Sequence, residues 1–168
     1  TDQTPMKVVA VNESLGNFSE IIDNINCIVE YMKNFICHFW YSKIALGHRN
    51  GLKIRIYGQK ASAEWVQEFP ENLNLSYANG KRCIFDRGDN KAEISNQKRY
   101  VRFKAGHPSG YIEAFENLYH DIFDALHYYK ENHHRILTNY LGVDQAFEGM
   151  KLLEAIQKSS QTKVWETV

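Results

Sequence analysis

A periodic apolar segment in the second half of the chain constrains the fold most strongly. Between Ile112 and Tyr129 the apolar residues recur largely at steps of three and four. They are Ile112, Phe115, Leu118, Tyr119, Ile122, Phe123, Leu126 and Tyr129. Because this spacing places side chains on one face of a helix, we expect a helix from about Tyr111 to about Asn132.

A short loop precedes this helix, with the sequence Gly106-His107-Pro108-Ser109-Gly110. Pro108 fixes one backbone angle and the two glycines permit angles that other residues avoid, so the loop can present His107 and Ser109 at a surface. A hydrolase nucleophile needs serine at the centre of Gly-x-Ser-x-Gly, but Pro108 occupies the centre here. We therefore expect Ser109 to cap the helix instead.

The rest of the chain predicts strands and one more helix. Strand-like runs lie at 8–11, 25–31, 35–45, 52–57, 61–68, 73–77, 81–85 and 163–168. A turn at 32–34 and the dipeptide Asn79-Gly80 join neighbouring runs as hairpins. The second helix begins near Gly142 with Asp144 as its N-cap. Its expected apolar face is Phe147, Met150, Leu153 and Ile156.

Strands that are grouped together and helices that are grouped together are typical of the α+β class. We expect residues 1–168 to form a single domain, built on an open, mostly antiparallel sheet with helices packed on one face. The other face of the sheet is then free to bind a partner.

Composition narrows the function classes. The chain has 20 Lys and Arg residues and 20 Asp and Glu residues, and this balance argues against a nucleic-acid binder, which needs a basic face. No apolar run is long enough to cross a bilayer, so we expect no membrane association. The polar start predicts no signal peptide.

The three cysteines favour a reducing compartment over a disulfide framework, so we expect a cytoplasmic protein with free thiols. If the first hairpin turns at Lys33-Asn34, Cys27 lies opposite Trp40 and Cys37 lies opposite Glu30. The two cysteines would then not face each other.

The sequence motifs for a nucleotide-binding site and for a metal site are absent or incomplete. No glycine-rich fingerprint of a dinucleotide or a phosphate loop is present, so we assign no cofactor-binding residue. Glu116 with His120, and Asp124 with His127, stand at helical spacing and fit either a metal site or ordinary ion pairs on a helix surface. We assign neither a metal ligand nor a catalytic residue.

Several motifs in a fixed order resemble a known family. They are Gly47-His48-Arg49-Asn50, Ile54-x-Ile56-Tyr57-Gly58, Trp65-x-Gln67-Glu68-x-Pro70, Gly106 to Phe115, and a tail from Phe147 through Ser159-Ser160 to Trp165. From about residue 20 onward the chain is similar to the C-terminal domain of the glucose–fructose oxidoreductase/inositol dehydrogenase (Gfo/Idh/MocA) family.

The resemblance implies a fragment of an NAD- or NADP-dependent oxidoreductase that acts on a sugar, an inositol or a related polyol. The N-terminal Rossmann domain and the segments that supply the family's Lys and His are missing from this sequence. The chain should therefore be inactive alone, shape the substrate site, and form a homo-oligomer through the open sheet face. Because they lie in matched loops, we expect His48, Arg49 and His107 to contact substrate; a purely structural role for these loops is the alternative.

Two other functions stay open at this stage. The chain could be a free-standing, non-catalytic module that binds a protein or a carbohydrate through its aromatic sheet face. A small metal hydrolase built on His120 and His127 would need a bound metal ion.

Overall fold

A computed structural model describes residues 4–15, 21–92, 95, 97–133 and 142–168. The chain divides into two compact units, residues 1–47 with 141–168, and residues 48–140. In the described residues each unit contains one four-stranded sheet and one α-helix, and all strand pairs are antiparallel. The α+β prediction is confirmed, with two sheets where we had expected one.

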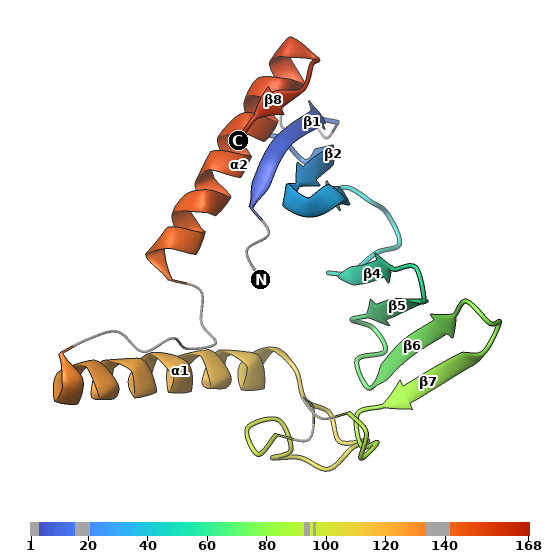
Figure 1. Cartoon of the computed structure of the whole chain (residues 1–168), viewed down its shortest axis with the longest axis vertical. Coiled ribbons are helices and arrows are strands. Elements are labelled where there is room, and N and C mark those ends of the chain that lie inside the picture. The colour runs from blue at the N-terminus through green and yellow to red at the C-terminus, as the bar shows by residue number, and fades with distance from the viewer. Residues whose placement is uncertain (1–3, 16–20, 93–94, 96, 134–141) are drawn as a thin grey trace. The chain divides into compact units, whose positions relative to one another are not determined.

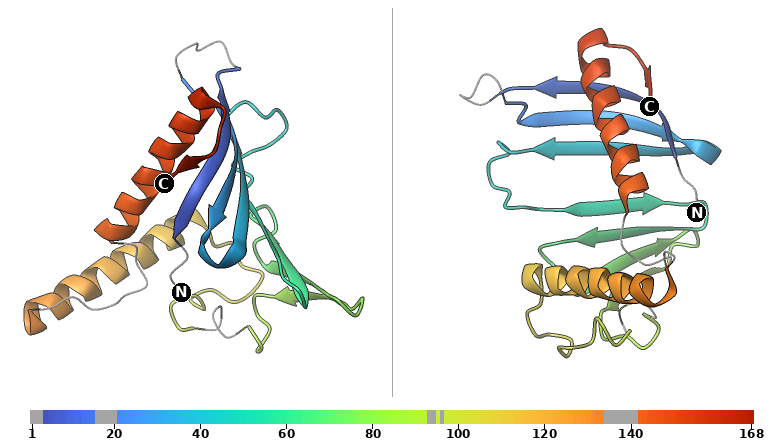
Figure 2. Two further views of the ribbon diagram at one scale, coloured as in Figure 1. Left: turned by 45° about the horizontal axis from the view of Figure 1, so that its top comes forward. Right: turned by 90° about the vertical axis from the view of Figure 1, so that its left-hand side faces the viewer.

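The first unit holds sheet A, whose strand order is β3-β2-β1-β8. Its elements are β1 (Pro5–Glu13), β2 (Asn24–Tyr31), the short 3-10 helix η1 (Met32–Asn34), β3 (Phe35–Ser42), α2 (Val143–Thr162) and β8 (Glu166–Thr167). Helix α2 packs on β1, and β8 returns beside the same strand (Figures 1 and 2).

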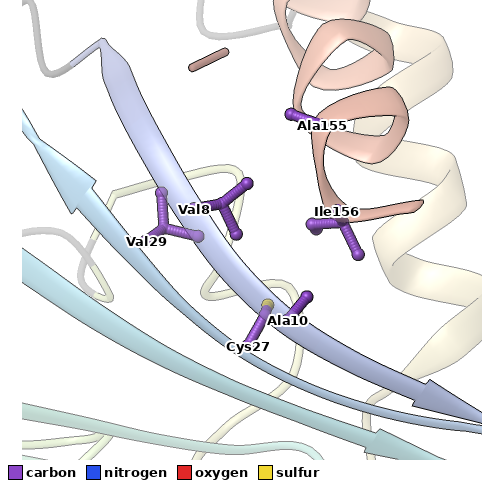
Figure 3. Packing of buried hydrophobic residues seen from close by; sticks show 6 residues of the cluster. All are labelled: Val8, Ala10, Cys27, Val29, Ala155 and Ile156. Atoms are coloured by element: carbon purple, nitrogen blue, oxygen red, sulfur yellow. The ribbon is translucent and has the colours of Figure 1, made fainter. Parts of the chain in front are cut away.

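The buried core lies between sheet A and the second half of α2 (Figure 3). Its members are Val8, Ala10, Cys27, Val29, Ala155 and Ile156. The predicted apolar face of α2 is correct only at Ile156, because Phe147, Met150 and Leu153 are exposed. The buried face contains Ala155 and Ser159 instead. Small side chains allow the helix to approach the strand closely, and a search for large apolar residues overlooks them.

The β2–β3 hairpin differs from its predicted register by one residue. Cys27 lies opposite Phe39 and Cys37 lies opposite Val29, because the turn formed by η1 centres the hairpin on Lys33 and not between Lys33 and Asn34. A shift of one residue moves side chains to the other face, so both cysteines lie on the side of the sheet that faces α2. Burial raises the pKa of both thiols, and all three cysteines are free, as predicted.

The second unit holds sheet B, whose strand order is β4-β5-β6-β7 (Figure 1). Its elements are β4 (Lys53–Tyr57), β5 (Ala61–Val66), β6 (Asn72–Tyr77), β7 (Arg82–Asp86) and α1 (Tyr111–Asn132). The predicted hairpin at Asn79-Gly80 and the predicted bounds of α1 are confirmed. No described residue between 48 and 133 is fully buried.

Apolar side chains nevertheless share one face of sheet B. The register aligns them in two rows, Ile54, Trp65, Leu73, Phe85 and Ile56, Ala63, Leu75, Cys83. The apolar residues of α1 are likewise exposed, among them Phe115, Leu126 and Tyr129. Since an apolar face of this kind is stabilised by burial, the second unit has surfaces that a partner could cover.

Both helices begin at a glycine, and neither predicted cap is correct. The N-cap of α1 is Gly110 and not Ser109, and the Gly110 amide donates to the Glu113 carboxylate at 2.7 Å. The N-cap of α2 is Gly142 and not Asp144, and its amide donates to the side chain of Gln145 at 2.9 Å. In each case the side chain at the third helical position reaches back to the cap. In the described chain neither helix is long and apolar enough to span a bilayer.

Candidate functional site

The register of sheet B brings three connecting segments to one end of the sheet. Lys53 pairs with Val66, and Asn72 pairs with Asp86, so β4 and β6 start where β5 and β7 finish. The segments 48–52, 67–71 and 87–110 therefore all emerge at the same end, which we name the loop end of sheet B. Two motifs of the resemblance contribute His48-Arg49-Asn50 and Gln67-Glu68-x-Pro70 to these segments, and the Gly106 loop lies in the third. The motif from Ile54 to Gly58 instead follows β4 to the other end of the sheet.

The first segment carries His48 and Arg49 and is tied to the second. The Gln67 amide donates to the Leu52 carbonyl at 2.9 Å, and the Gln67 side-chain oxygen accepts a bond from the Leu52 amide at 3.1 Å. Gly51 lies directly against Glu68, since a Cβ atom at Gly51 would stand 2.6 Å from a Glu68 carboxylate oxygen. A side chain at position 51 would displace that carboxylate, so glycine lets the two segments pack together.

Arg87 organises the third segment. Its Nε donates to both carboxylate oxygens of Glu71, at 3.0 and 2.9 Å. Its two terminal nitrogens donate to the carbonyls of Tyr100, Phe103 and Lys104, at 3.4, 3.2 and 3.2 Å. Its side chain is only 15% exposed. A largely buried guanidinium is stable when its donors are occupied by hydrogen bonds in this way.

The same contacts continue to His107. Glu71 accepts a hydrogen bond from the Gly106 amide at 3.4 Å. The Lys104 carbonyl, already bound by Arg87, lies 3.1 Å from the His107 amide and 3.2 Å from His107 Nδ1. The imidazole is therefore fixed to the loop through one nitrogen, and His107 is exposed.

Two more arginines fasten the third segment to α1. Arg99 makes a bidentate ion pair with Asp121, both distances being 2.8 Å. This hydrogen bonding by Arg99 lowers the pKa of the Asp121 carboxyl. Arg102 pairs with Glu116, so one carboxylate of the suggested metal pair is already occupied by a cation. Among the described residues no group of three possible metal ligands occurs.

The structure places the three predicted substrate contacts at the loop end of sheet B. His48 and Arg49 precede edge strand β4, whereas His107 follows β7 at the opposite edge. Three strand spacings separate these edges, roughly 14 Å. Their role in binding substrate stays a prediction.

The reasoning from sequence did not identify Glu71 and Arg87, although a signal was present. The hairpin register pairs Asn72 with Asp86, so the next two residues outward, one acidic and one basic, lie opposite each other. Opposite charges at positions symmetric about Asn79, the middle residue of the turn 78–80, predict a cross-strand ion pair.

The described residues do not fit a dinucleotide. A phosphate site of that kind uses free backbone amides where a helix begins directly after a strand. Here 24 residues separate the end of β7 from the start of α1. The Glu113 carboxylate already occupies the Gly110 amide. We therefore assign no step that involves a nicotinamide to the residues that the structure describes.

Comparison with known proteins settles the family. Residues 3–168 match the family described as the oxidoreductase family, C-terminal alpha/beta domain (Gfo/Idh/MocA). The chain belongs to this family. The Gfo/Idh/MocA resemblance inferred from the motifs is thereby confirmed over nearly the whole length.

Individual relatives are longer than this Gfo/Idh/MocA domain. The uncharacterized oxidoreductase YfiI of Bacillus subtilis is 28% identical over 155 residues, which are 90% of this chain and 39% of that protein. An oxidoreductase from Pseudomonas syringae has a TM-score of 0.89 at 26% identity, over 99% of this chain and 46% of that chain. An inositol dehydrogenase homolog from Azotobacter vinelandii, complexed with NADH and myo-inositol, has a TM-score of 0.85 at 23% identity, over 99% and 45%. The chain thus spans less than half the length of these relatives.

Proposed function

We propose that this chain is the substrate-side domain of an NAD(P)-dependent oxidoreductase that acts on a sugar, an inositol or a related polyol. The main support is the family match over residues 3–168. The chain also covers less than half the length of its relatives. The chain alone does not catalyse hydride transfer under this proposal, because the described residues do not fit the cofactor that carries the chemistry. The free thiols favour the cytoplasm as its compartment.

The loop end of sheet B is the proposed substrate side. Arg49, His48 and His107 can each hydrogen-bond hydroxyl groups, and they are carried by segments that Gln67 and Arg87 hold in place. A polyol presents several hydroxyls at once, so polar groups spread along one end of a sheet suit it.

Activity measurements test this proposal. The proposal implies a longer protein in which this chain is joined to a Rossmann domain. That longer protein should reduce NAD⁺ or NADP⁺ with at least one member of a panel of inositols, pyranoses and linear polyols. The 168-residue chain should reduce neither cofactor with any of them. A longer protein that is inactive on the whole panel, or an active isolated chain, would refute the proposal.

Arg49→Gln provides the residue-level test. Loss of a charged hydrogen bond to substrate costs about 1.5–3 kcal/mol, so the KM for the polyol should rise at least about tenfold. Arg82→Gln is the matched control, because Arg82 starts β7 at the other end of the sheet. Equal KM values for the two variants would show that Arg49 does not contact the substrate.

The partners follow from the same proposal. The face of sheet A that points away from α2 has a groove of about 410 Å³, lined by residues that include Val9, Ile28, His38 and Trp40. Trp40 is 63% exposed there. We assign this face to a second copy of the protein, and we assign the N-terminal Rossmann domain as the cofactor-binding partner. A monomeric, inactive protein that binds a carbohydrate or another protein would support a free-standing binding module instead.

A further inference from the structure

The hydrogen bond at His107 fixes which of its two nitrogens can meet a ligand. His107 Nδ1 lies 3.2 Å from the Lys104 carbonyl oxygen. A carbonyl oxygen only accepts, so in the neutral imidazole the proton sits on Nδ1. Nε2 is then left with its lone pair, as a hydrogen-bond acceptor at an exposed position.

The Lys104 carbonyl is not placed by its own strand or helix, since it lies in the irregular segment between β7 and α1. Arg87 places it instead. The guanidinium spans the carbonyls of residues 100, 103 and 104, and Glu71 fixes the guanidinium through two bonds. Glu71 also accepts a hydrogen bond from the amide of Gly106, two residues after Lys104 in the chain.

We infer that Arg87 and Glu71 are positioning residues that hold His107 in the Nδ1–H tautomer, so that Nε2 accepts a hydrogen bond from a hydroxyl group of the ligand. The identity of that ligand as a polyol rests on the proposed function, whereas the tautomer does not. The planar guanidinium of Arg87 donates to three carbonyls at once. The compact ammonium group of a lysine cannot make the same three hydrogen bonds, because its donors do not lie in one plane.

Nitrogen-15 NMR of the imidazoles in the 168-residue chain tests the inference without substrate or cofactor. At about pH 8.5, above the range in which histidines ordinarily titrate, His107 should show mainly the Nδ1–H tautomer. His127 is an internal standard, because its Nε2 faces the Glu131 carboxylate at 3.2 Å and should carry the proton. A wild-type His107 that is mainly in the Nε2–H form would overturn the proposal before any variant is made.

Arg87→Lys and Glu71→Gln test the positioning role. Since a typical hydrogen bond contributes about 0.5–1.5 kcal/mol, each variant should lower the ratio of Nδ1–H to Nε2–H at His107 by about two- to tenfold. Arg55→Lys is the matched control, because Arg55 pairs with Glu64 across β4 and β5 and should leave the ratio unchanged. A ratio that is unchanged or higher in the Arg87 and Glu71 variants refutes the positioning role. If one variant loses the dispersed amide signals of β4–β7, the other decides.

A second readout separates this inference from the proposed function. In the longer protein, Arg87→Lys and His107→Ala should each raise the KM for the polyol, and their effects should be non-additive because they act through one contact. Additive effects would show that Arg87 does not act through His107. If the tautomer result holds but the longer protein oxidises no polyol, the proposed function fails and the arrangement of His107 stands. If the protein is active but His107 is in the other tautomer, the inference alone fails.

Discussion

Ser159 completes the hydrogen bonding of a buried strand edge. It is fully buried, and its hydroxyl accepts from the Ala10 amide at 2.9 Å and donates to the Val164 carbonyl at 2.7 Å. Strand β8 pairs with β1 only at Lys7 and Val8, so the helix hydroxyl replaces the strand partner that Ala10 lacks.

Ser159→Ala should therefore destabilise the first unit by about 1–3 kcal/mol, the cost of leaving a buried donor without a partner. Urea unfolding followed by hydrogen exchange of the Ala10 amide measures this change. Ser160→Ala is the control, because Ser160 accepts from the Asn12 amide at 3.1 Å at a partly exposed position. A larger loss for Ser160→Ala than for Ser159→Ala would contradict the assignment.

Glu113 makes the stability of the start of α1 depend on pH. Its hydrogen bond from the Gly110 amide lowers the pKa of the carboxyl below the ordinary value of 4.5. A carboxyl whose pKa is lower in the folded state stabilises the fold above pH 4.5, and this stabilisation is lost as the pH falls through the lowered pKa.

The melting temperature of the wild type should thus exceed that of Glu113→Gln at neutral pH, and the difference should shrink below pH 4.5. Gln keeps an acceptor for Gly110 but does not titrate, so the comparison isolates the charge. Melting curves from pH 3 to pH 7 supply the measurement, and a difference that widens in acid would be inconsistent with this role.

At the scale of elements, the end of α2 is strained at one residue. Lys163 is the C-cap in the left-handed region, with φ of 60°, where a residue with a Cβ atom is disfavoured by roughly 1–2 kcal/mol. Glycine is the preferred residue at this place, so Lys163→Gly should stabilise the first unit by up to about 1 kcal/mol.

Lys151→Gly provides the matched comparison within the same helix. Lys151 lies in the interior of α2, where glycine costs about 1 kcal/mol relative to a good helix former. The two substitutions should shift the urea midpoint of the first unit in opposite directions. Shifts of the same sign would mean that the left-handed cap carries no strain.

The elements that the sequence predicted well are those with local signals. The bounds of α1 follow from apolar periodicity, and the β6–β7 hairpin follows from Asn79-Gly80. The turn at 32–34 was predicted, but the β2–β3 register was wrong, because a turn without glycine has no clear local mark for its central residue. The predicted buried face of α2 was correct at Ile156 and wrong at Phe147, Met150 and Leu153, because small residues, Ala155 and Ser159, are buried in their place.

The site shows the same division. Glu71 and Arg87 could have been found from the hairpin symmetry, because the hairpin places them opposite each other. The bonds from Arg87 to the carbonyls of residues 100–104 could not, since main-chain carbonyls are common to every sequence and loop geometry decides which of them converge.

At the scale of the whole molecule, the open face of sheet A should control self-association. Trp40 and Ile36 are 63% and 57% exposed there, and exposed apolar groups in this arrangement mark an interface. Under the proposed assembly, Trp40→Glu should convert an oligomer to a monomer, because a charge buried in an interface without a partner is strongly unfavourable.

Light scattering after size-exclusion chromatography measures this effect. Gln157→Glu, which adds the same charge on the exposed surface of α2, should leave the mass of the particle unchanged. If Trp40→Glu remains oligomeric, the interface does not lie on this face.

The contacts of Arg87 have a consequence for how this protein can change over evolution. Arg87 recognises the backbone of residues 100–104 and makes no demand on their side chains. The side chains of Tyr100, Phe103 and Lys104 can therefore be exchanged without removing these hydrogen bonds. The part that holds the loop is therefore separate from the side chains that can vary.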